Sequence, residues 1–271
     1  MHFGLPVHPI AFQLGRFTVT TYGVMVALAF VAGLWTASRR SVRDGIPGEK
    51  ILDLGPWLIV GAILGARALF VVSYWQEEFA GKPFLEILAI WHGGVVFYGG
   101  FIGASLAFVL YTRLKHVQMW KLADALAPSI ALGSVFGRVG CLLNGCCYGR
   151  ECHLPWAVTF PADSRGAPAG IPRHPVQLYD ASLNLVCYLG LAWLYRRKKF
   201  DGQVFAVYLI AYALLRFFVE TFRGDYHEHY LGGWATQAQV VSIGILVAGL
   251  ILWPVLRRQN APLRASPEAK R

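Results

Sequence analysis

The sequence has little charge: of its 271 residues only 15% are Asp, Glu, Lys or Arg, against about 25% in soluble domains. The mean hydropathy of +0.47 agrees with this shortage. Several windows of at least about 18 residues are apolar and almost free of charge, which is the length that spans a bilayer. The composition therefore excludes a cytosolic enzyme, a disordered chain and a secreted disulfide scaffold. It predicts an all-α polytopic membrane protein.

About seven helical spans are predicted, each with roughly the 20 residues that cross a hydrocarbon core. They cover residues 18–37, 52–74, 94–112, 122–143, 178–195, 203–222 and 237–256. The flank before the first span lacks a basic n-region, and Ala37-Ser38 after the span runs into Arg39-Arg40 without a small-residue cleavage site, so we expect this span to be retained. We expect a single transmembrane domain over 1–256, with an irregular external cap or arm at 144–177 between spans four and five, and a disordered tail at 257–271.

Acidic residues are scarcer than basic ones, 15 against 25, which gives a net charge of +10. In a soluble protein this charge would suggest nucleic acid, but here sixteen basic residues fall on one side, in loops 38–51, 113–121 and 196–202 and in the tail, and only six on the other. Cytoplasmic loops are the ones enriched in Lys and Arg. The pattern predicts an external amino terminus, a cytoplasmic carboxyl terminus, anionic membrane lipids as neighbours and no nucleic-acid partner.

Three arginines, Arg67, Arg138 and Arg216, lie inside the predicted spans. A charge at the centre of a bilayer costs at least ~2.5–3.5 kcal/mol on insertion scales. These arginines therefore predict partners or a polar cavity in the membrane interior.

The block FGRVGCLLNGCCYGRECH (136–153) sets Arg138 near the outer end of span four, followed by Asn144 and Gly149. A planar arginine fork beside glycine backbone suits a phosphate group. The alternative is an internal pair between Arg138 and a carboxylate. Because the only carboxylate of span four, Asp124, is near its opposite end, we favour the interpretation in which Arg138 faces a ligand.

In the block YALLRFFVETFRGDY (212–226), Tyr212, Arg216 and Glu220 recur at every fourth position and form one polar stripe on an apolar helix. Arg223 follows at the outer end. Glu220 is expected to neutralise part of the charge of the two arginines and to orient them. One acid against two bases predicts a net positive cavity.

The block WHGGVVFYGGFIG (91–103) contains glycine pairs at the outer end of span three, with His92 and Tyr98 between and beside them. Glycine there permits close approach of a neighbouring helix or of a lipid headgroup, and both interpretations stay open. A single His or Tyr at this depth is more often an anchor than a catalyst. The block RHPVQLYD (173–180) reads as a turn that opens a helix.

Cysteines are few, and four of the five cluster at the outer end of span four: Cys141, Cys146, Cys147 and Cys152. Their C-x4-C-C-x4-C spacing matches no established zinc pattern, so we predict neither a metal nor a cofactor. On an oxidising outer face a disulfide such as Cys147–Cys152 is plausible. A structural bridge or a small packed thiol is favoured over a metal or redox role.

Taken together and in order, five blocks resemble the prolipoprotein diacylglyceryl transferase family over nearly the whole chain. They are TTYG around Tyr22, LGAR ending at Arg67, the glycine pairs at 93–103, GRVGCLLNG at 137–145, and RHPVQLYD with YALLRFFVETFR. Any one of these blocks is a weak signal, but the ordered set is specific.

The resemblance implies a catalytic domain in the bacterial cytoplasmic (inner) membrane that moves the diacylglyceryl group of phosphatidylglycerol to the lipobox cysteine of a preprolipoprotein and releases glycerol phosphate. It implies catalytic roles for Arg138 and Arg216. We add Tyr98 as a third candidate catalytic residue. For substrate binding, the resemblance and the motifs together give Arg138, Tyr22, Arg67, His92, Asn144, Gly149, Tyr212, Glu220 and Arg223.

The chain departs from the family pattern at three positions. Tyr98 stands where the family has a histidine, Cys141 where it has asparagine, and Cys146 where it has glutamate. His92 is displaced by six residues from the family histidine. These departures keep open a related lipid transferase with another donor or acceptor, and a thiol-redox membrane protein that uses the cysteine cluster. A transporter is the weakest alternative, because no matched pair of broken helices is evident.

Overall fold

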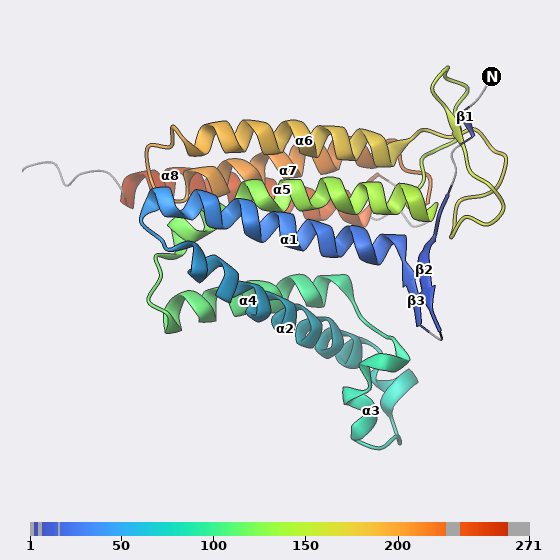
Figure 1. Cartoon of the computed structure of the whole chain (residues 1–271), viewed down its shortest axis with the longest axis horizontal. Coiled ribbons are helices and arrows are strands. Elements are labelled where there is room, and N and C mark those ends of the chain that lie inside the picture. Colours follow the sequence, from blue (N-terminus) through green and yellow to red (C-terminus); the bar gives the residue numbers. More distant parts are fainter. Residues whose placement is uncertain (1–2, 5–6, 16, 226–233, 260–271) are drawn as a thin grey trace, which may run out of the picture. The chain divides into compact units, whose positions relative to one another are not determined.

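The computed structural model is predominantly helical and describes residues 3–4, 7–15, 17–225 and 234–259 (Figure 1). The long helices are α1 (Thr21–Ser41), α2 (Gly48–Ser73), α4 (Phe97–Leu114), α5 (Met119–Asn144), α6 (Val176–Tyr195), α7 (Gln203–Glu220) and α8 (Gln237–Gln259). Short elements join them: η1 (Val42–Asp44), η2 (Trp75–Phe79), α3 (Leu85–Leu88) and η3 (Ile90–His92). Each long helix coincides with one of the seven predicted spans.

Six of these helices are long and apolar enough to cross a membrane, which confirms a polytopic membrane protein. The helix outside this set is α6, which is 20 residues long but carries Gln177, Asp180 and Asn184 on its buried side. These polar residues lower its hydropathy, so the count of seven crossings stays a prediction. Bulky apolar side chains on the helix surfaces, such as Val31, Leu64 and Leu106, are more than 60% exposed, as expected for faces in contact with lipid.

The chain divides into two compact units, residues 1–37 with 123–271, and residues 38–122. In the first unit, the long helices lie side by side, with α6 and α8 both packed on α7 (Figure 1). Gly140 of α5 lets α1 approach, because a Cβ added there would lie 3.2 Å from the Tyr22 ring. A hydrogen bond of 2.8 Å between Thr36 and Ser129 joins the same two helices.

One end of the first unit is irregular and holds the predicted cap. Strand β1 (Phe3–Gly4) pairs in parallel with β4 (Val158–Thr159), and β2 (Ile10–Leu14) pairs antiparallel with β3 (Phe17–Thr20). Between Gly145 and Pro175 the backbone follows turns and isolated bridges, with Phe160 buried beneath them. The sequence explains this region, since its many Gly and Pro residues prevent a continuous helix.

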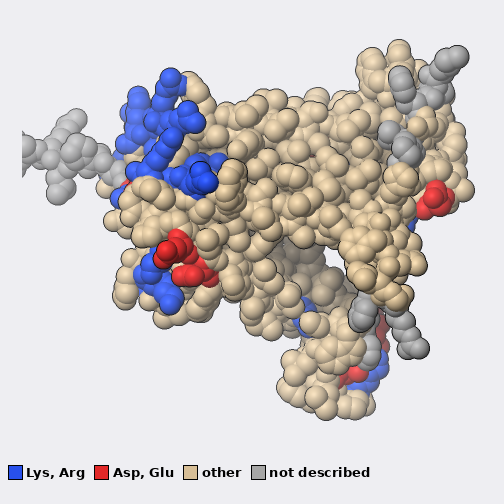
Figure 2. All heavy atoms as spheres, viewed as in Figure 1, with Lys and Arg blue, Asp and Glu red and all other residues tan. Residues whose placement is uncertain are grey.

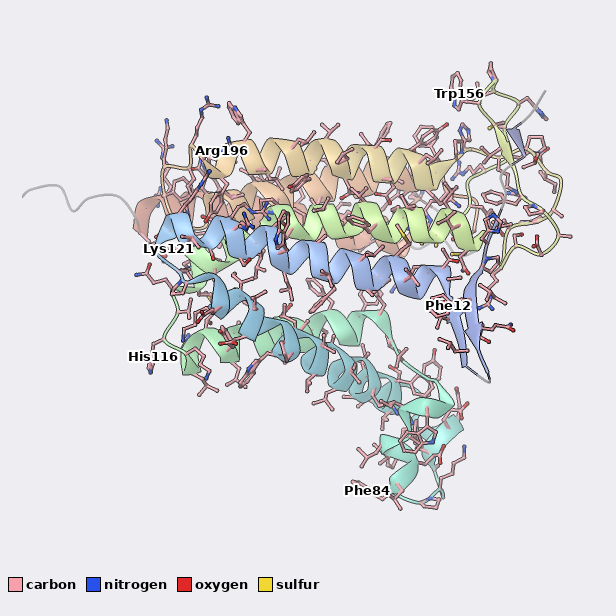
Figure 3. The ribbon with its side chains drawn as sticks, viewed as in Figure 1. Phe12, Phe84, His116, Lys121, Trp156 and Arg196 are labelled. Atoms are coloured by element: carbon pink, nitrogen blue, oxygen red, sulfur yellow. The ribbon has the colours of Figure 1, made fainter. Side chains whose placement is uncertain are left out.

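The opposite end of the first unit is basic. Figure 2 shows Lys and Arg side chains gathered where α6 gives way to α7, the connection that carries Arg196, Arg197, Lys198 and Lys199. Figure 3 places Arg196 at this end and Trp156 among the turns at the other end. Lys198 anchors the connection, because its Nζ lies 3.0 Å from Asp124 of α5.

The second unit is built on a close crossing of α2 and α4. A Cβ added at Gly103 would lie 2.8 Å from the Cα of Gly65, and one added at Gly61 would lie 2.7 Å from the carbonyl of Gly103. Glycines at these positions let the two backbones touch, so the glycine-rich block serves helix packing. Figure 3 places His116 at one end of this unit and Phe84 at the other, on the arm formed by η2 and α3.

The predicted tail at 257–271 lies almost wholly outside the described residues, apart from the last three residues of α8. Whether residues 1–256 act as one domain stays a prediction.

Candidate active site

Arg138 of α5 lies at the centre of the candidate site in the first unit. Its Nε is 2.6 Å from a carboxylate oxygen of Asp180, and the two side chains are 22% and 7% exposed. The internal pair with a carboxylate, which the sequence made the less favoured interpretation, is therefore present, because the partner comes from α6 and not from the same helix as Arg138. The guanidinium is nevertheless partly exposed, so the pair orients Arg138 and leaves it within reach of a ligand.

A polar face on α6 builds this arrangement. Gln177, Asp180 and Asn184 follow one another at spacings of three and four residues, so they share one side of the helix. Asn184 donates to Asp180 at 2.6 Å, and Gln177 donates to the carbonyl of Cys146 at 2.8 Å. The face therefore fixes both the carboxylate that holds Arg138 and the loop that follows α5.

A second ion-pair network lies at the carboxyl end of α7. The carboxylate of Glu220 is fully buried and lies 2.5 Å from Arg216 and 3.9 Å from Arg223. Thr236 donates to the other oxygen of Glu220 at 2.8 Å. The sequence predicts partners or a polar cavity for the three membrane arginines, and the structure gives Arg138 the partner Asp180 and Arg216 the partner Glu220.

Asp225 changes the predicted charge of this network. Both oxygens of Asp225 accept from Arg223, at 2.9 and 2.6 Å. With Asp180 and Glu220 it gives one carboxylate for each of Arg138, Arg216 and Arg223, more acid than the sequence pattern indicated, and the net positive cavity stays a prediction. The planar N–H groups of these arginines are suited to hold an anion.

Glycine backbone joins these elements. Gly149 is buried and forms an antiparallel bridge with Arg223. A Cβ at Gly149 would lie 2.7 Å from that of His174, and one at Gly224 would lie 2.6 Å from the carbonyl of Gly149. Gly149 therefore brings the loop after α5 against the end of α7 and the start of α6. We retain the prediction that Gly149 contacts the substrate.

Tyr22 lies within electrostatic range of Arg138 and of the three cysteines Cys141, Cys146 and Cys147. Asn144 ends α5, and its side-chain amide donates to the sulfur of Cys146 at 3.4 Å. Tyr212 lies one turn before Arg216 on α7, with its ring 5.9 Å from that of Tyr208. The first unit thus brings together Tyr22, Arg138, Asn144 and the end of α7.

The cysteines differ from their prediction. All five lie in the described part of the chain and all are free thiols, so the expected Cys147–Cys152 disulfide is not formed. The physical reason is that Cys147 turns toward Cys141 and Cys146, with the three sulfurs within 4.8 Å of one another. Cys152 lies elsewhere, where its backbone N–H donates to Pro172.

The thiol of Cys147 has an unusual environment. Hydrogen bonds from Cys141 and Cys146 lower its pKa well below the usual range for cysteine, and the charges of Arg223 and Arg138 lower the pKa further against the effect of burial. The hydrogen bond with Cys141 lowers the pKa of Cys146, but the bond with Cys147 and burial outweigh it, so the net pKa of Cys146 is raised.

The other predicted residues belong to the second unit. Arg67 is buried and donates to the carbonyls of Glu86, Ile87, Gly93 and Gly94 at 2.6–3.0 Å. Four of its five N–H groups thus bind backbone carbonyls between residues 86 and 94. This favours a structural role for Arg67 over the predicted contact with substrate. Tyr98 starts α4, is 38% exposed and stacks edge-on against Phe97. The side chain of His92 lies outside the described residues.

The sequence analysis does not identify Gln177 and Asp180, which belong to the block interpreted as a turn and a helix start, or Asn184, which lies beyond that block. Their spacing was a usable signal, because three polar residues on one face of a span predict a buried polar contact. Asp225 was missed because it lies beyond the end of the helix that carries Arg216.

Comparison with known proteins adds to this geometry. The family model described as prolipoprotein diacylglyceryl transferase matches residues 9–255. Proteins named phosphatidylglycerol–prolipoprotein diacylglyceryl transferase are similar to this chain along most of its length. The relative from Rhodospirillum rubrum is 35% identical and the alignment covers 95% of this chain and 96% of that protein. The one from Geobacillus kaustophilus is 36% identical, with 94% of each chain covered.

Proposed function

Since the chain belongs to the prolipoprotein diacylglyceryl transferase family, we propose that it transfers the diacylglyceryl group of phosphatidylglycerol to a cysteine thiol. The acceptor is the lipobox cysteine of a preprolipoprotein, and glycerol phosphate is released. This reaction is the first step of lipoprotein lipidation.

The observation that carries this proposal is the position of Arg138. Its guanidinium is held by Asp180, is partly exposed, and belongs to a cluster with Arg223 and Arg216 at the irregular end of the helices. In the transfer, the sulfur forms a bond to the glycerol carbon while the bond from that carbon to the phosphate oxygen breaks. The electron pair stays on the departing phosphate, where N–H donors already in place stabilise the transition state more than the ground state.

The acidic partners give this site its rigidity. Because Asp180 and Glu220 fix Arg138 and Arg216, the donors need little reorganisation as charge develops on the phosphate. We assign Arg223, Tyr22, Tyr212, Asn144 and Gly149 to the binding of the lipid headgroup and retain Tyr98 as a contributor. The acceptor thiol has an unperturbed pKa of about 8.5, so the positive side chains also favour its ionised form.

We further propose that the protein lies in the bacterial cytoplasmic membrane, with the irregular end of the first unit outside. Four consecutive basic residues at 196–199 lie at the end opposite to Trp156 (Figure 3). Basic loops stay on the cytoplasmic side. This orientation would put Arg138 near the outer leaflet, where phosphatidylglycerol and a translocated acceptor are both reachable.

The test uses the purified full chain in detergent with phosphatidylglycerol and a synthetic lipobox peptide, followed by the mass of the peptide. We expect a diacylglyceryl mass gain. Arg138→Ala should lose at least about 100-fold in rate, which is the cost of removing one transition-state donor, and Arg138→Lys should keep little activity because it lacks the planar fork. Arg197→Ala, at the basic end, is the matched control and should keep full activity.

Competition between lipids tests the donor. An equal mixture of phosphatidylglycerol with another anionic phospholipid should give product from phosphatidylglycerol alone. Transfer from the other lipid would favour a related transferase with a different donor, and a folded wild-type protein without any transfer would refute the proposed function.

A further inference from the structure

Three cysteines outside the arginine network form a compact group in the first unit. Cys141 belongs to the last turn of α5, and Cys146 and Cys147 follow the end of the helix. Their sulfurs all lie within 4.8 Å of one another. Cys141 is buried and the other two are partly exposed, so the group is enclosed but can be reached from one side.

The backbone is shaped to make this group. After α5 ends, Gly145 turns the chain with a φ of +67°, and the N–H of Cys146 donates back to the carbonyl of Cys141 at 3.1 Å. Cys147 has a φ of +59°, in the left-handed region that a residue other than glycine rarely adopts. Gln177 of α6 holds the carbonyl of Cys146 at 2.8 Å. A strained residue held by its surroundings is a reason to look for function.

We propose that Cys141, Cys146 and Cys147 form a three-thiolate site for a thiophilic divalent cation, with zinc as the best chemical fit. Zn–S bonds of about 2.3 Å place sulfurs around one tetrahedral ion roughly 3.8 Å apart. The three sulfurs lie within 4.8 Å of one another, so they must approach by at most about 1 Å to reach that separation. Three protein ligands leave a fourth position open to a small donor such as water or a thiolate.

The charges around the site are suitable. When the cation binds, the thiols give up their protons to solvent, and three thiolates with one Zn²⁺ carry a net charge of −1. Arg138 and Arg223 lie close enough to act electrostatically on Cys147, while each also forms an ion pair with a carboxylate, Asp180 and Asp225. The amide of Asn144 donates to the sulfur of Cys146 at 3.4 Å, as second-shell groups do for metal thiolates. This inference does not depend on the proposed transferase activity.

The spacing of the three cysteines along the sequence does not by itself indicate a metal site. In C-x4-C-C the first two cysteines are five residues apart, and only the helix end and the turn at Gly145 bring their sulfurs together. Cys152, which completes the sequence pattern, is not part of the group.

The test titrates the full, untagged chain with Zn²⁺ against a chromophoric chelator, after reduction with a phosphine. Co²⁺ in a parallel titration reports thiolate ligands through its sulfur-to-metal charge-transfer band. We expect one tight equivalent of metal. Cys141→Ser and Cys147→Ser should each weaken binding by more than about 100-fold, since second-shell changes alone cost 10- to 100-fold. Cys152→Ser and Cys187→Ser are the matched controls and should bind as the wild type does.

Two results would refute the proposed metal site. One is a reduced, folded wild-type protein that takes up no stoichiometric Zn²⁺ and shows no cobalt–thiolate band. The other is equal weakening by Cys187→Ser and Cys147→Ser, which would mean that binding is adventitious. Circular dichroism and elution volume of every variant show whether a loss reflects unfolding, and the wild-type titration decides the question even where a variant fails to fold.

Discussion

At the scale of single residues, Arg138 and Asp180 show how a charged side chain is kept in an apolar helix and used there. Nε of Arg138 lies 2.6 Å from Asp180, whose other oxygen accepts from Asn184. Breaking a buried pair by removing one partner costs about 3–5 kcal/mol, because the other charge is left uncompensated. The pair therefore couples the stability of α6 to the orientation of Arg138.

Asp180 is a positioning residue, so Asp180→Asn should act through Arg138. We expect a fall in kcat of about 10- to 100-fold, with no further loss when Asp180→Asn is added to Arg138→Ala, because residues that act as a unit are not additive. Asp124→Asn is the matched control, since Asp124 belongs to a buried pair with Lys198 at the other end of α5. It should lower the melting temperature but keep kcat per folded molecule. Additive losses in the double variant would show that Asp180 acts independently of Arg138.

Tyr98 and Arg138 can be ranked by how much transfer activity is lost when each is substituted. A phenol with an unperturbed pKa of about 10 is a poor base at neutral pH, so its expected role is to position the headgroup. Tyr98→Phe should lower transfer to the lipobox peptide several-fold, whereas Arg138→Ala should abolish it. Equal losses from the two substitutions in the same assay would refute this ranking.

At the scale of elements, α2 and α4 pack through glycine on both helices. A Cβ at Gly103 would lie 2.8 Å from the backbone of Gly65, a separation that real Cβ atoms do not show. The approach is set by backbone, so a flexible side chain cannot relieve the contact.

Substitution of glycine by alanine should therefore have opposite effects on stability at Gly103 and Gly190. Gly103→Ala should destabilise the protein by about 1–3 kcal/mol through overpacking. Gly190→Ala in α6, where an added Cβ meets nothing within 4 Å, should stabilise it by up to about 1 kcal/mol, because alanine is the better helix former. Thermal unfolding in detergent measures both. A stable Gly103→Ala protein would contradict the close crossing of α2 and α4.

The helices could be predicted from the sequence, but the pairing of charges could not. Each long helix is marked by an apolar run, and runs are local. The pairs Arg138–Asp180 and Arg223–Asp225 depend on where α6 begins and on how the chain leaves α7. For the same reason the spacing of the cysteines does not indicate the group of three free thiols that the turn at Gly145 brings together. The backbone carbonyls that bind Arg67 likewise leave no mark in a sequence.

At the scale of the whole molecule, the proposed orientation in the membrane can be tested directly. Trp156 and Arg196 lie at opposite ends of the first unit (Figure 3). In intact cells, a membrane-impermeant maleimide should label Trp156→Cys and should reach Arg196→Cys only after the membrane is opened. Both variants are made with the five native cysteines replaced by serine. Labelling of Arg196→Cys in intact cells would contradict the proposed orientation.

The proposed transfer reaction is best tested by measuring both of its products in one experiment. The full chain is reconstituted in phosphatidylglycerol vesicles with a lipobox peptide, and the diacylglyceryl peptide and the released glycerol phosphate are quantified together by mass spectrometry. We expect equal amounts of the two products from the wild-type protein and neither from Arg138→Ala. Glycerol phosphate without lipidated peptide, or lipidated peptide formed equally well by Arg138→Ala, would contradict the proposed reaction.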